Sequence, residues 1–242
     1  MTGTSSGGRV PAAGPAPAAP DRLPSLRVTE IFHSIQGEST WAGLPCTFVR
    51  LTGCPLRCAW CDTAYAFHGG TRRSLAEIVD EVAGHGTPLV EITGGEPLVQ
   101  PNAFVLAERL LDAGHTVLVE TSGAVDVSPL DPRAHKIMDL KCPGSGESAK
   151  NLWSNLRHLG PGDEVKFVVK DRADWDWVVE VVRERGLDAR VREGRLRALL
   201  VSPVWGETDL DALARWMLDE RLPLRLQVQL HKLVWGADAR GV

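Results

Sequence analysis

Three cysteines stand close together in the stretch RLTGCPLRCAWCDT, and this cluster constrains the fold more than any other feature of the sequence. Cys54, Cys58 and Cys61 have the spacing C-x3-C-x2-C and follow a short apolar run that is typical of a strand. The chain has five cysteines, an odd number at uneven spacing, which argues against the disulfide framework of a secreted protein. The cluster instead indicates a metal-binding loop in a reducing compartment, so we expect a cytoplasmic protein.

The composition of the whole chain is that of a water-soluble globular protein. Of its 242 residues, 43% are hydrophobic and 24% are charged, which is enough for one substantial core. The net charge of −4 gives no reason to expect a nucleic-acid partner, because phosphate recognition needs a clustered basic face. No apolar run approaches the roughly 20 residues of a membrane helix, and the N-terminus lacks an apolar signal core. We therefore expect neither nucleic acid nor a membrane as a partner.

Residues 1–22 differ from the rest, because they are mostly Gly, Ser, Ala and Pro. We predict a disordered tail there and one domain over residues 23–242. Short β-branched or Leu-rich runs in this domain, several of them without strict alternation, predict parallel strands that are covered by helices. These predicted strands are 47–53, 88–93, 116–121, 135–140, 164–170, 197–203 and 225–231.

Between these strands, apolar residues recur at helical spacing. The pattern predicts helices at 74–86, 101–114, 173–186, 207–222 and, from a less regular pattern, 148–160. The first opens with Ser74 and Glu77, which have the spacing of a capping box. No helical pattern lies between Glu120 and His135. Repeated strand–helix units predict an α/β barrel or an open parallel sheet, with the chemistry at the carboxyl ends of the strands.

The cysteine loop allows two kinds of metal site. A zinc site would need a fourth ligand, and Cys46 is the nearest thiol, but zinc cysteines usually come as two close pairs separated by a longer gap. Three thiolates alone suit a 4Fe–4S cluster in which one iron stays open to an outside ligand. The spacing, with Trp60 between the last two cysteines, favours the cluster, and Cys46 is then an ordinary buried thiol.

The stretch CPLRCAWC resembles the cluster loop of radical S-adenosylmethionine enzymes. The resemblance implies a partial (β/α)6-type TIM barrel with reduced helices. It also implies that S-adenosylmethionine chelates the open iron and is cleaved to a 5′-deoxyadenosyl radical. The stretch EITGGEP follows a predicted strand and is similar to the motif that binds the methionine amino group. Resemblance implies cofactor contacts from Trp60, Asp62, Gly95, Glu96, Asp139, Leu140 and Lys141.

Two outer segments narrow the resemblance to the 7-carboxy-7-deazaguanine synthases. Residues 31–54 resemble the opening of that family, with QGE before F-x-R-x-x-G-C, and residues 226–236 resemble its closing Q-x-H-K segment. The family contracts the ring of 6-carboxy-5,6,7,8-tetrahydropterin, releases ammonia and forms 7-carboxy-7-deazaguanine. It uses Mg²⁺, and Thr63 matches the hydroxyl that contacts this ion. The product could enter tRNA modification, as in queuosine biosynthesis, or a deazapurine natural product, and the sequence leaves both open.

The substrate implied by this resemblance is a pterin with a carboxylate. Arg50 can bind a carboxylate through two parallel hydrogen bonds, while Gln36 and Glu38 suit the amide and amino edge of a pterin. The full set of implied substrate contacts is Ile35, Gln36, Gly37, Glu38, Arg50, Thr93, Glu120 and His231. The family also implies a reducing electron donor, such as a flavodoxin, and a homodimer.

Two alternatives remain open at this stage. An activase of glycyl-radical enzymes shares the C-x3-C-x2-C loop, but it acts on a protein and has no need of the elements at Gln36–Glu38 and His231. A zinc module without enzymatic activity is the other. The segment after Trp235 runs beyond the H-K element, and the sequence does not show whether Val242 helps to close a pocket.

Overall fold

A single curved sheet of nine strands organises the computed structural model, which describes Met1 and residues 24–242. Apart from Met1, the expected tail at 1–22 lies outside the described residues. The strands occur in the order β3-β1-β2-β4-β5-β6-β7-β8-β9. Their bounds are β1 Ser25–Ile35, β2 Pro45–Leu51, β3 Thr71–Ser74, β4 Leu89–Gly94, β5 Thr116–Thr121, β6 His135–Leu140, β7 Glu164–Val169, β8 Ala198–Pro203 and β9 Leu224–Leu226.

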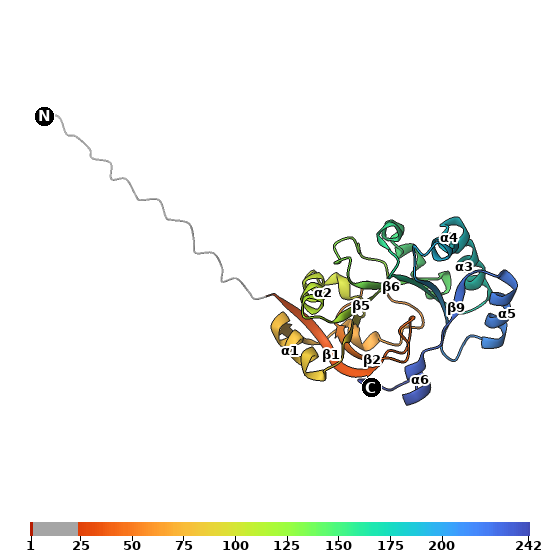
Figure 1. The fold of residues 1–242 in the computed structure, drawn as a ribbon. Coiled ribbons are helices and arrows are strands. Elements are labelled where there is room, and N and C mark those ends of the chain that lie inside the picture. Colours follow the sequence, from red (N-terminus) through yellow and green to blue (C-terminus); the bar gives the residue numbers. More distant parts are fainter. Residues whose placement is uncertain (2–23) are drawn as a thin grey trace.

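Seven strands, from β2 to β9 along the sheet, run parallel, while β1 and β3 are antiparallel additions at one edge. The sheet curls into an arc with the helices outside it (Figure 1). It does not close, because β3 and β9 are its two ends. The prediction of a partial barrel is therefore confirmed, and the six strands β2 and β4 to β8 form its centre.

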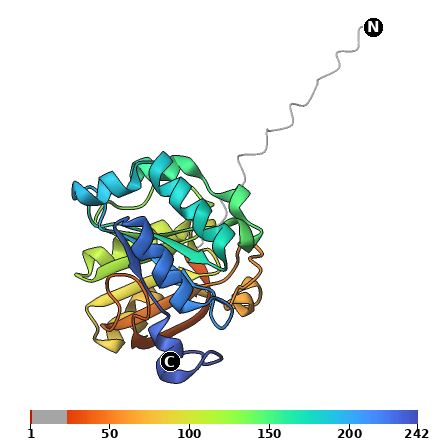
Figure 2. The ribbon, with the colours of Figure 1, turned by 90° about the vertical axis from the view of Figure 1, so that its right-hand side faces the viewer.

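Five helices cover the outside of this arc, namely α1 Leu75–His85, α2 Asn102–Asp112, α3 Arg172–Glu184, α4 Leu187–Arg192 and α5 Leu210–Glu220. A sixth, α6 Leu230–Trp235, follows β9 at the open side of the barrel. Short 3-10 helices are η1 Ala64–Phe67, η2 Pro97–Val99, η3 Pro143–Ser145, η4 Ser148–Lys150 and η5 Trp153–His158. From the side, α3 and α5 lie across the strands (Figure 2). Among the described residues, no helix is long and apolar enough to cross a bilayer.

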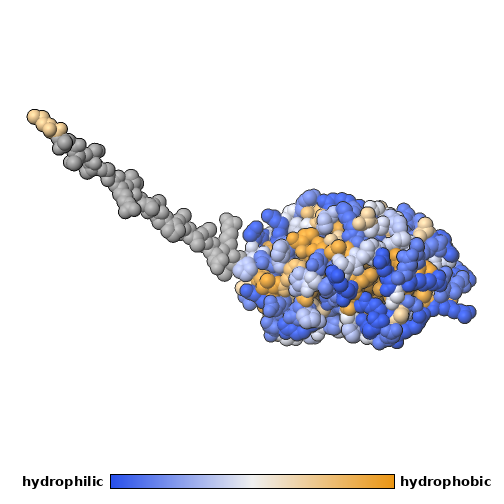
Figure 3. Space-filling model, turned by 90° about the horizontal axis from the view of Figure 1, so that it is seen from above, coloured by the Kyte–Doolittle hydropathy of each residue, from blue (hydrophilic) through white to orange (hydrophobic). Residues whose placement is uncertain are grey.

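Strand alternation separates the core from the cavity. In β7, Val165, Phe167 and Val169 are buried in the core cluster that also contains Trp175 of α3. Lys166, between them, faces the inside of the barrel and lines its cavity. Successive side chains of a strand point to opposite faces, so one strand supplies both the apolar layer under the helices and the polar lining. On the outer surface, seen from above, hydrophilic residues surround hydrophobic ones near the middle of the molecule (Figure 3).

The crossover from β5 to β6 lacks a helix, as predicted from the sequence. The fully buried side chain of Asn155 replaces the missing backbone pairing there. Its amide nitrogen donates to the carbonyls of Gly123 at 3.0 Å and Val125 at 2.8 Å, and its oxygen accepts from the amide of Val127 at 3.2 Å. One side chain thus satisfies loop groups that would otherwise be buried without partners.

Two predicted elements need correction. The strand expected at 225–231 is only Leu224–Leu226, and the chain then turns into α6. The expected helix at 148–160 consists of η4 and η5 instead, because the chain there follows the bend around Asn155 rather than a straight cylinder. The sequence analysis also did not predict β1, β3 and α4.

The capping box of α1 is present. The Ser74 hydroxyl accepts from the Glu77 amide at 3.2 Å, and the Glu77 carboxylate accepts from the Ser74 amide at 2.7 Å. We expect Ser74→Ala to lower the free energy of unfolding by about 1 kcal/mol, which calorimetry would record as a fall in Tm of about 2–4 °C. Ser74→Thr retains the hydroxyl and is the control. An unchanged Tm in the alanine variant would show that this cap contributes nothing.

Candidate functional site

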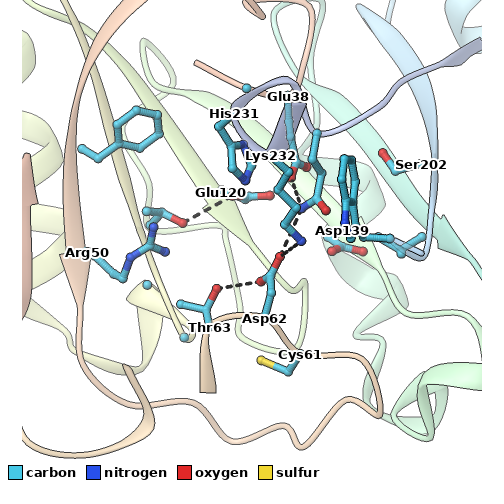
Figure 4. A pocket seen from close by; sticks show the side chains of 18 of the residues that line it. Glu38, Arg50, Cys61, Asp62, Thr63, Glu120, Asp139, Ser202, His231 and Lys232 are labelled. Atoms are coloured by element: carbon cyan, nitrogen blue, oxygen red, sulfur yellow. Dashed lines mark hydrogen bonds and ion pairs between the residues drawn. The ribbon is translucent and has the colours of Figure 1, made fainter. Parts of the chain in front are cut away.

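A cavity of about 540 Å³ opens at the carboxyl ends of the parallel strands. The sequence-predicted site residues line it, with the exceptions of Glu96 and Leu140. The Leu140 side chain is fully buried in the hydrophobic core under α3, so only its backbone is available to a ligand. Figure 4 shows Cys61 and Asp62 low in the view, Arg50 at the left, and Glu38, Glu120 and His231 above them.

The cysteine loop is attached to its surroundings on two sides. Gly53, just before Cys54, accepts from the amide of Glu96 at 2.8 Å, and its own φ of 105° is a conformation that favours glycine. A Cβ at Gly95 would stand 2.5 Å from the carbonyl oxygen of Gly53 and 2.7 Å from Cys54 Cβ. Only a glycine at 95 therefore lets the EITGGEP turn approach the cysteine loop this closely.

The other attachment of the loop involves the segment after β6. The amide of Arg57 donates to Glu147 at 2.6 Å, the amide of Ala59 donates to the carbonyl of Ser145 at 3.0 Å, and Lys150 Nζ donates to the carbonyl of Pro55 at 2.8 Å. These contacts hold the backbone around the thiols without using the thiols themselves.

The three thiols Cys54, Cys58 and Cys61 are half-buried, and none forms a disulfide. Burial raises the pKa of Cys58, while the ammonium of Lys141 lowers it. Among residues 24–242, no three His, Cys, Asp or Glu side chains are grouped as a site for a single metal ion. A cubane cluster does not require such convergence, because each of its cysteines binds a different iron atom.

The cavity wall beside the cysteines carries Asp139 and Lys141, whose side chains are joined by an ion pair of 2.8 Å. The other carboxylate oxygen of Asp139, Oδ1, is buried without a hydrogen-bond partner among the described residues, and so is the hydroxyl of Ser202. Both residues line the cavity. A buried polar atom without a partner is costly. Three free thiols beside Asp139, in a cavity that also contains the Ser202 hydroxyl, therefore fit a bound 4Fe–4S cluster and a polar cofactor.

Glu96 lies behind the cavity wall rather than in it. Its carboxylate is fully buried and accepts from the Thr121 hydroxyl at 3.0 Å and from the Ser122 amide at 2.7 Å. It also accepts from the amide of Leu98 at 3.0 Å. In this arrangement Glu96 joins the ends of β4 and β5. The amino group of a bound cofactor could contact the Glu96 carboxylate only if the carboxylate also kept these hydrogen bonds.

Arg50 lines the cavity on the side of β2. Its Nε donates to Glu30 at 2.8 Å, and the hydroxyl of Tyr65 donates to the same carboxylate oxygen at 2.8 Å. The guanidinium carbon lies 5.7 Å from the ring centre of Phe32 and 5.9 Å from that of Tyr65. The side chain is only 16% exposed. Glu30 and the two rings therefore hold the guanidinium group in one orientation. Glu30 accepts its hydrogen bond from Nε of this group.

The segment after β9 closes the open side of the barrel. The amide of Leu230 donates to the carbonyl of Gly37 at 2.9 Å, and Gln229 Nε2 donates to Glu38 at 2.7 Å. Lys232 Nζ lies 2.5 Å from Asp62 Oδ2. Residues 237–242 also line the cavity, and Arg240 lies over the ring of Tyr65 at 4.3 Å. Val242, whose role the sequence left open, is thus part of the wall.

Asp62 and His231 differ in charge because of this segment. Burial alone would raise the pKa of Asp62, but the charge of Lys232 and hydrogen bonds from Lys232, Thr63 and Gln229 lower it. Although 44% of the Asp62 side chain is exposed, that surface faces the cavity. Burial lowers the pKa of His231 and outweighs the raising effect of Glu38. Asp62 is therefore ionised at neutral pH, and His231 is favoured as the neutral imidazole.

Sequence analysis missed several residues of this cavity. Among them are Glu91, Lys166, Ser202, Gln229 and Lys232. The available signals were a lysine at alternate spacing within the apolar strand 164–170 and two polar residues close to His231 in the sequence. Thr63, the expected magnesium contact, lines the cavity and its hydroxyl donates to Asp62 at 2.8 Å.

The Gly37→Ala variant tests whether the segment after β9 must pack directly against Gly37 to close the cavity. A Cβ at this position would lie 2.2 Å from His231 Nδ1 and 3.1 Å from the His231 amide nitrogen. We expect Gly37→Ala to displace α6 and to weaken the binding of a cavity ligand by about 1–3 kcal/mol, measured as a rise in KM. Gly84→Ala, where a Cβ meets nothing within 4 Å, is the control. Equal KM values in the two variants would contradict the closure described here.

Comparison with known proteins agrees with these features. The Radical SAM superfamily matches residues 48–191. The chain is 43% identical over 233 residues to the 7-carboxy-7-deazaguanine synthase of Koribacter versatilis, covering 90% of this chain and 100% of that protein. It is also 43% identical over 220 residues to the enzyme of the same name from Chlorobaculum tepidum, covering 90% and 97%.

The fold has a counterpart among solved structures. The crystal structure of QueE from Escherichia coli superposes with a TM-score of 0.66 at 23% identity, covering 84% of this chain and 94% of that one. The similarity at this identity concerns the fold. Together with the sequence relatives and the three-cysteine loop at the mouth of a partial barrel, it places this chain in the 7-carboxy-7-deazaguanine synthase family of the Radical SAM superfamily.

Proposed function

We propose that this chain converts 6-carboxy-5,6,7,8-tetrahydropterin into 7-carboxy-7-deazaguanine, with release of ammonia, as a lyase of deazapurine biosynthesis. The observation that carries the proposal is one cavity lined by the three thiols of the cysteine loop, by Arg50 and by the carboxylates of Glu38 and Glu120. The relatives that share this name match along nearly their whole length, so every part of the site has a counterpart region in them.

Cys54, Cys58 and Cys61 would hold the 4Fe–4S cluster and leave one iron for S-adenosylmethionine. When bound, the cluster and this cofactor would supply a 5′-deoxyadenosyl radical that takes a hydrogen atom from the pterin carbon bearing the carboxylate. The chain's own part is placement. Asp139 lies on the wall beside the thiols with one unpartnered carboxylate oxygen, and Ser202 adds an unpartnered hydroxyl elsewhere in the lining. Gly95 lets the EITGGEP turn pack against the cysteine loop.

The other residues that the family resemblance implies as cofactor contacts are also part of the proposed cofactor site. Trp60, Asp62 and Lys141 line the cavity, Leu140 offers its backbone, and Glu96 anchors the turn that bears Gly95. Because Lys141 is paired with Asp139, it can meet a cofactor hydroxyl or carboxylate without becoming an isolated buried charge.

The substrate would lie between Arg50 and the carboxylates of Glu38 and Glu120. The guanidinium can receive the pterin carboxylate through two parallel hydrogen bonds. Glu38 and Glu120 accept hydrogen bonds, so they suit the N–H edge of the pterin ring. Ile35, Gln36, Gly37, Thr93 and His231 complete the surface around this space.

Mg²⁺ would bind at Thr63 together with oxygens of the substrate and water. This ion prefers oxygen ligands and keeps much of its hydration shell, so one hydroxyl is a sufficient protein contact only when substrate is present. The Thr63 hydroxyl is hydrogen-bonded to the ionised Asp62, which places a further negative charge near the ion. We therefore expect substrate binding and Mg²⁺ binding to depend on each other.

Other expectations from the family stay proposals here. They are a reducing donor such as a flavodoxin, a homodimer, a cytoplasmic location, and the division into a tail at 1–22 and one domain at 23–242. The last is supported by a sheet that continues from Ser25 to Leu226.

The test is an anaerobic reaction with reconstituted protein, the pterin substrate, S-adenosylmethionine, Mg²⁺ and a chemical reductant. We expect 7-carboxy-7-deazaguanine by mass spectrometry, with one ammonia released per product and no net loss of S-adenosylmethionine. Protein with an intact cluster that cleaves S-adenosylmethionine but forms no deazapurine would reject the proposed substrate. Omission of Mg²⁺ should lower the rate.

A further inference from the structure

Lys166 of β7 is a buried cation at the centre of the cavity wall. Its side chain is 5% exposed, and Nζ lies 2.5 Å from Glu38 Oε2 and within hydrogen-bonding distance of Glu120 Oε1. Asp139 Oδ2 is 3.8 Å away. These acidic residues come from three places in the chain, namely the loop after β1, β5 and β6. One ammonium group therefore connects the side of the cavity assigned to the substrate with the side assigned to the cofactor.

The lysine leaves free acceptor capacity on each carboxylate. On Glu38, Lys166 binds one oxygen and Gln229 Nε2 binds the other at 2.7 Å. On Glu120, Lys166 binds one oxygen and the Thr93 hydroxyl donates to the other at 3.3 Å. A carboxylate has about four lone-pair sites. Each group is thus held at both oxygens, yet each can still accept from a ligand.

We propose that Lys166 is a positioning residue that holds the carboxylates of Glu38 and Glu120 aimed at one edge of the substrate, so that the cavity selects a heterocycle whose edge carries adjacent N–H donors. This rests on the function proposed above, because the aminopyrimidinone edge of a pterin is such an edge. A ring with acceptors at that edge would face two carboxylates and be rejected.

Charge balance supports this role. Burial alone would raise the pKa of Glu120, and the charge and hydrogen bond of Lys166 are the main causes that lower it. Removal of Lys166 leaves burial and the neighbouring acids as the larger influences, so the pKa of Glu120 should rise. The charged and titratable groups facing this centre are Glu38, Arg50, Glu91, Asp139, Lys141 and His231. The two other cations among them, Arg50 and Lys141, are paired with Glu30 and Asp139.

The sign of the expected pH effect follows. With Lys166 present, Glu120 has a lowered pKa and stays an acceptor from pH 6 to 9. In Lys166→Met, Glu120 gains a proton as the pH falls and then loses acceptor capacity. Relative to wild type at the same pH, ligand affinity should therefore fall by up to about tenfold for each pH unit below the new pKa, and the difference from wild type should shrink as the pH rises.

The experiment uses the cluster-loaded protein under anaerobic conditions. The dissociation constant of 6-carboxypterin, a fluorescent oxidised pterin, is measured from pH 6 to 9 for wild type, Lys166→Met and Lys166→Arg. Lys136→Met is the matched control, because Lys136 is also buried in a strand and paired with an acid, Asp163 at 3.2 Å, but does not line the cavity. Turnover of the tetrahydropterin by wild type is recorded in the same buffers.

Because the pterin probe itself loses a ring N–H proton at the alkaline end of this range, each dissociation constant is divided by the wild-type value at the same pH. We expect this ratio to be independent of pH for Lys136→Met and Lys166→Arg and to rise steeply at low pH for Lys166→Met. A ratio for Lys166→Met that does not change with pH would overturn the inference. If Lys166→Met does not fold, Glu120→Gln is measured instead, because a glutamine mimics the protonated acid. This variant should weaken pterin binding by the same factor at every pH. Unchanged binding by Glu120→Gln would also overturn the inference. Absence of turnover by wild type with normal pterin binding would instead reject the proposed reaction.

Discussion

Replacement of Cys58 by alanine is expected to reduce formation of 7-carboxy-7-deazaguanine to background. The cluster needs all three thiolates of the loop, and the chain offers no nearby substitute, because Cys46 and Cys142 are buried in the core away from the cavity. The reactive chemistry belongs to the cofactors, so loss of the cluster leaves a folded but inactive barrel. Iron content, visible absorbance and product formation are the measurements.

Cys142→Ala is the matched control for this variant. Cys142 is close to Lys141 in sequence, but its side chain packs in the hydrophobic core and burial holds the pKa of its thiol well above the usual range. We expect this variant to keep its iron and its activity, with a small loss of stability. Loss of cluster in Cys142→Ala, or retention of activity in Cys58→Ala, would show that the ligands have been assigned wrongly.

Arg50→Ala is expected to leave the cluster and the cleavage of S-adenosylmethionine largely intact while substrate binding is strongly weakened. Removing one partner of a desolvated ion pair costs roughly 3–5 kcal/mol, which corresponds to a rise in KM of about 10²- to 4 × 10³-fold. Arg50→Lys keeps the charge but not the two parallel hydrogen bonds, so an intermediate KM is expected. Steady-state kinetics and formation of 5′-deoxyadenosine separate the two effects.

Arg73→Ala controls for the loss of a partly buried arginine. Arg73 is 26% exposed and pairs with Glu81, and neither residue lines the cavity. Its removal should leave KM unchanged. Arg50→Ala with an unchanged KM, or with the same loss of 5′-deoxyadenosine formation as a cysteine variant, would contradict the substrate role of Arg50.

The strands of the barrel could be predicted from the sequence because their buried residues are locally consistent. Runs such as EVKFVVK at 164–170 contain enough β-branched and aromatic residues to indicate a strand at any register. The short strand β3 and the edge strand β1 were harder to predict. Long-range pairing holds them, such as Ser25 opposite Ser74, and no local pattern contains that information.

The site was predictable where a motif fixes backbone geometry. Gly95 and the cysteines belong to turns whose shape depends on residue type, as the 2.5 Å separation between a Cβ at Gly95 and the Gly53 carbonyl shows. Lys166 and Lys232 carry no such signal. They are functional candidates only because the curvature of the sheet and the docking of α6 bring their ammonium groups to acids that are 46 to 170 residues away in sequence.

The local structure around His231 also could not be predicted from the sequence alone. The run LQVQLH indicates a strand by composition, but the chain reaches the free edge of the sheet at β9 and turns to cover the open side of the barrel. The first residues of α6 then contact Gly37. Tertiary contact decided the local structure here, and the residue still reached the cavity that the family resemblance implied.

Electron paramagnetic resonance of the reduced cluster, with and without S-adenosylmethionine, tests most directly whether the three-cysteine loop leaves one iron open. We expect a brown protein with equal amounts of iron and sulfide, and a spectrum that changes when S-adenosylmethionine is added. A colourless protein with stoichiometric zinc, or a cluster spectrum that S-adenosylmethionine does not alter, would contradict it.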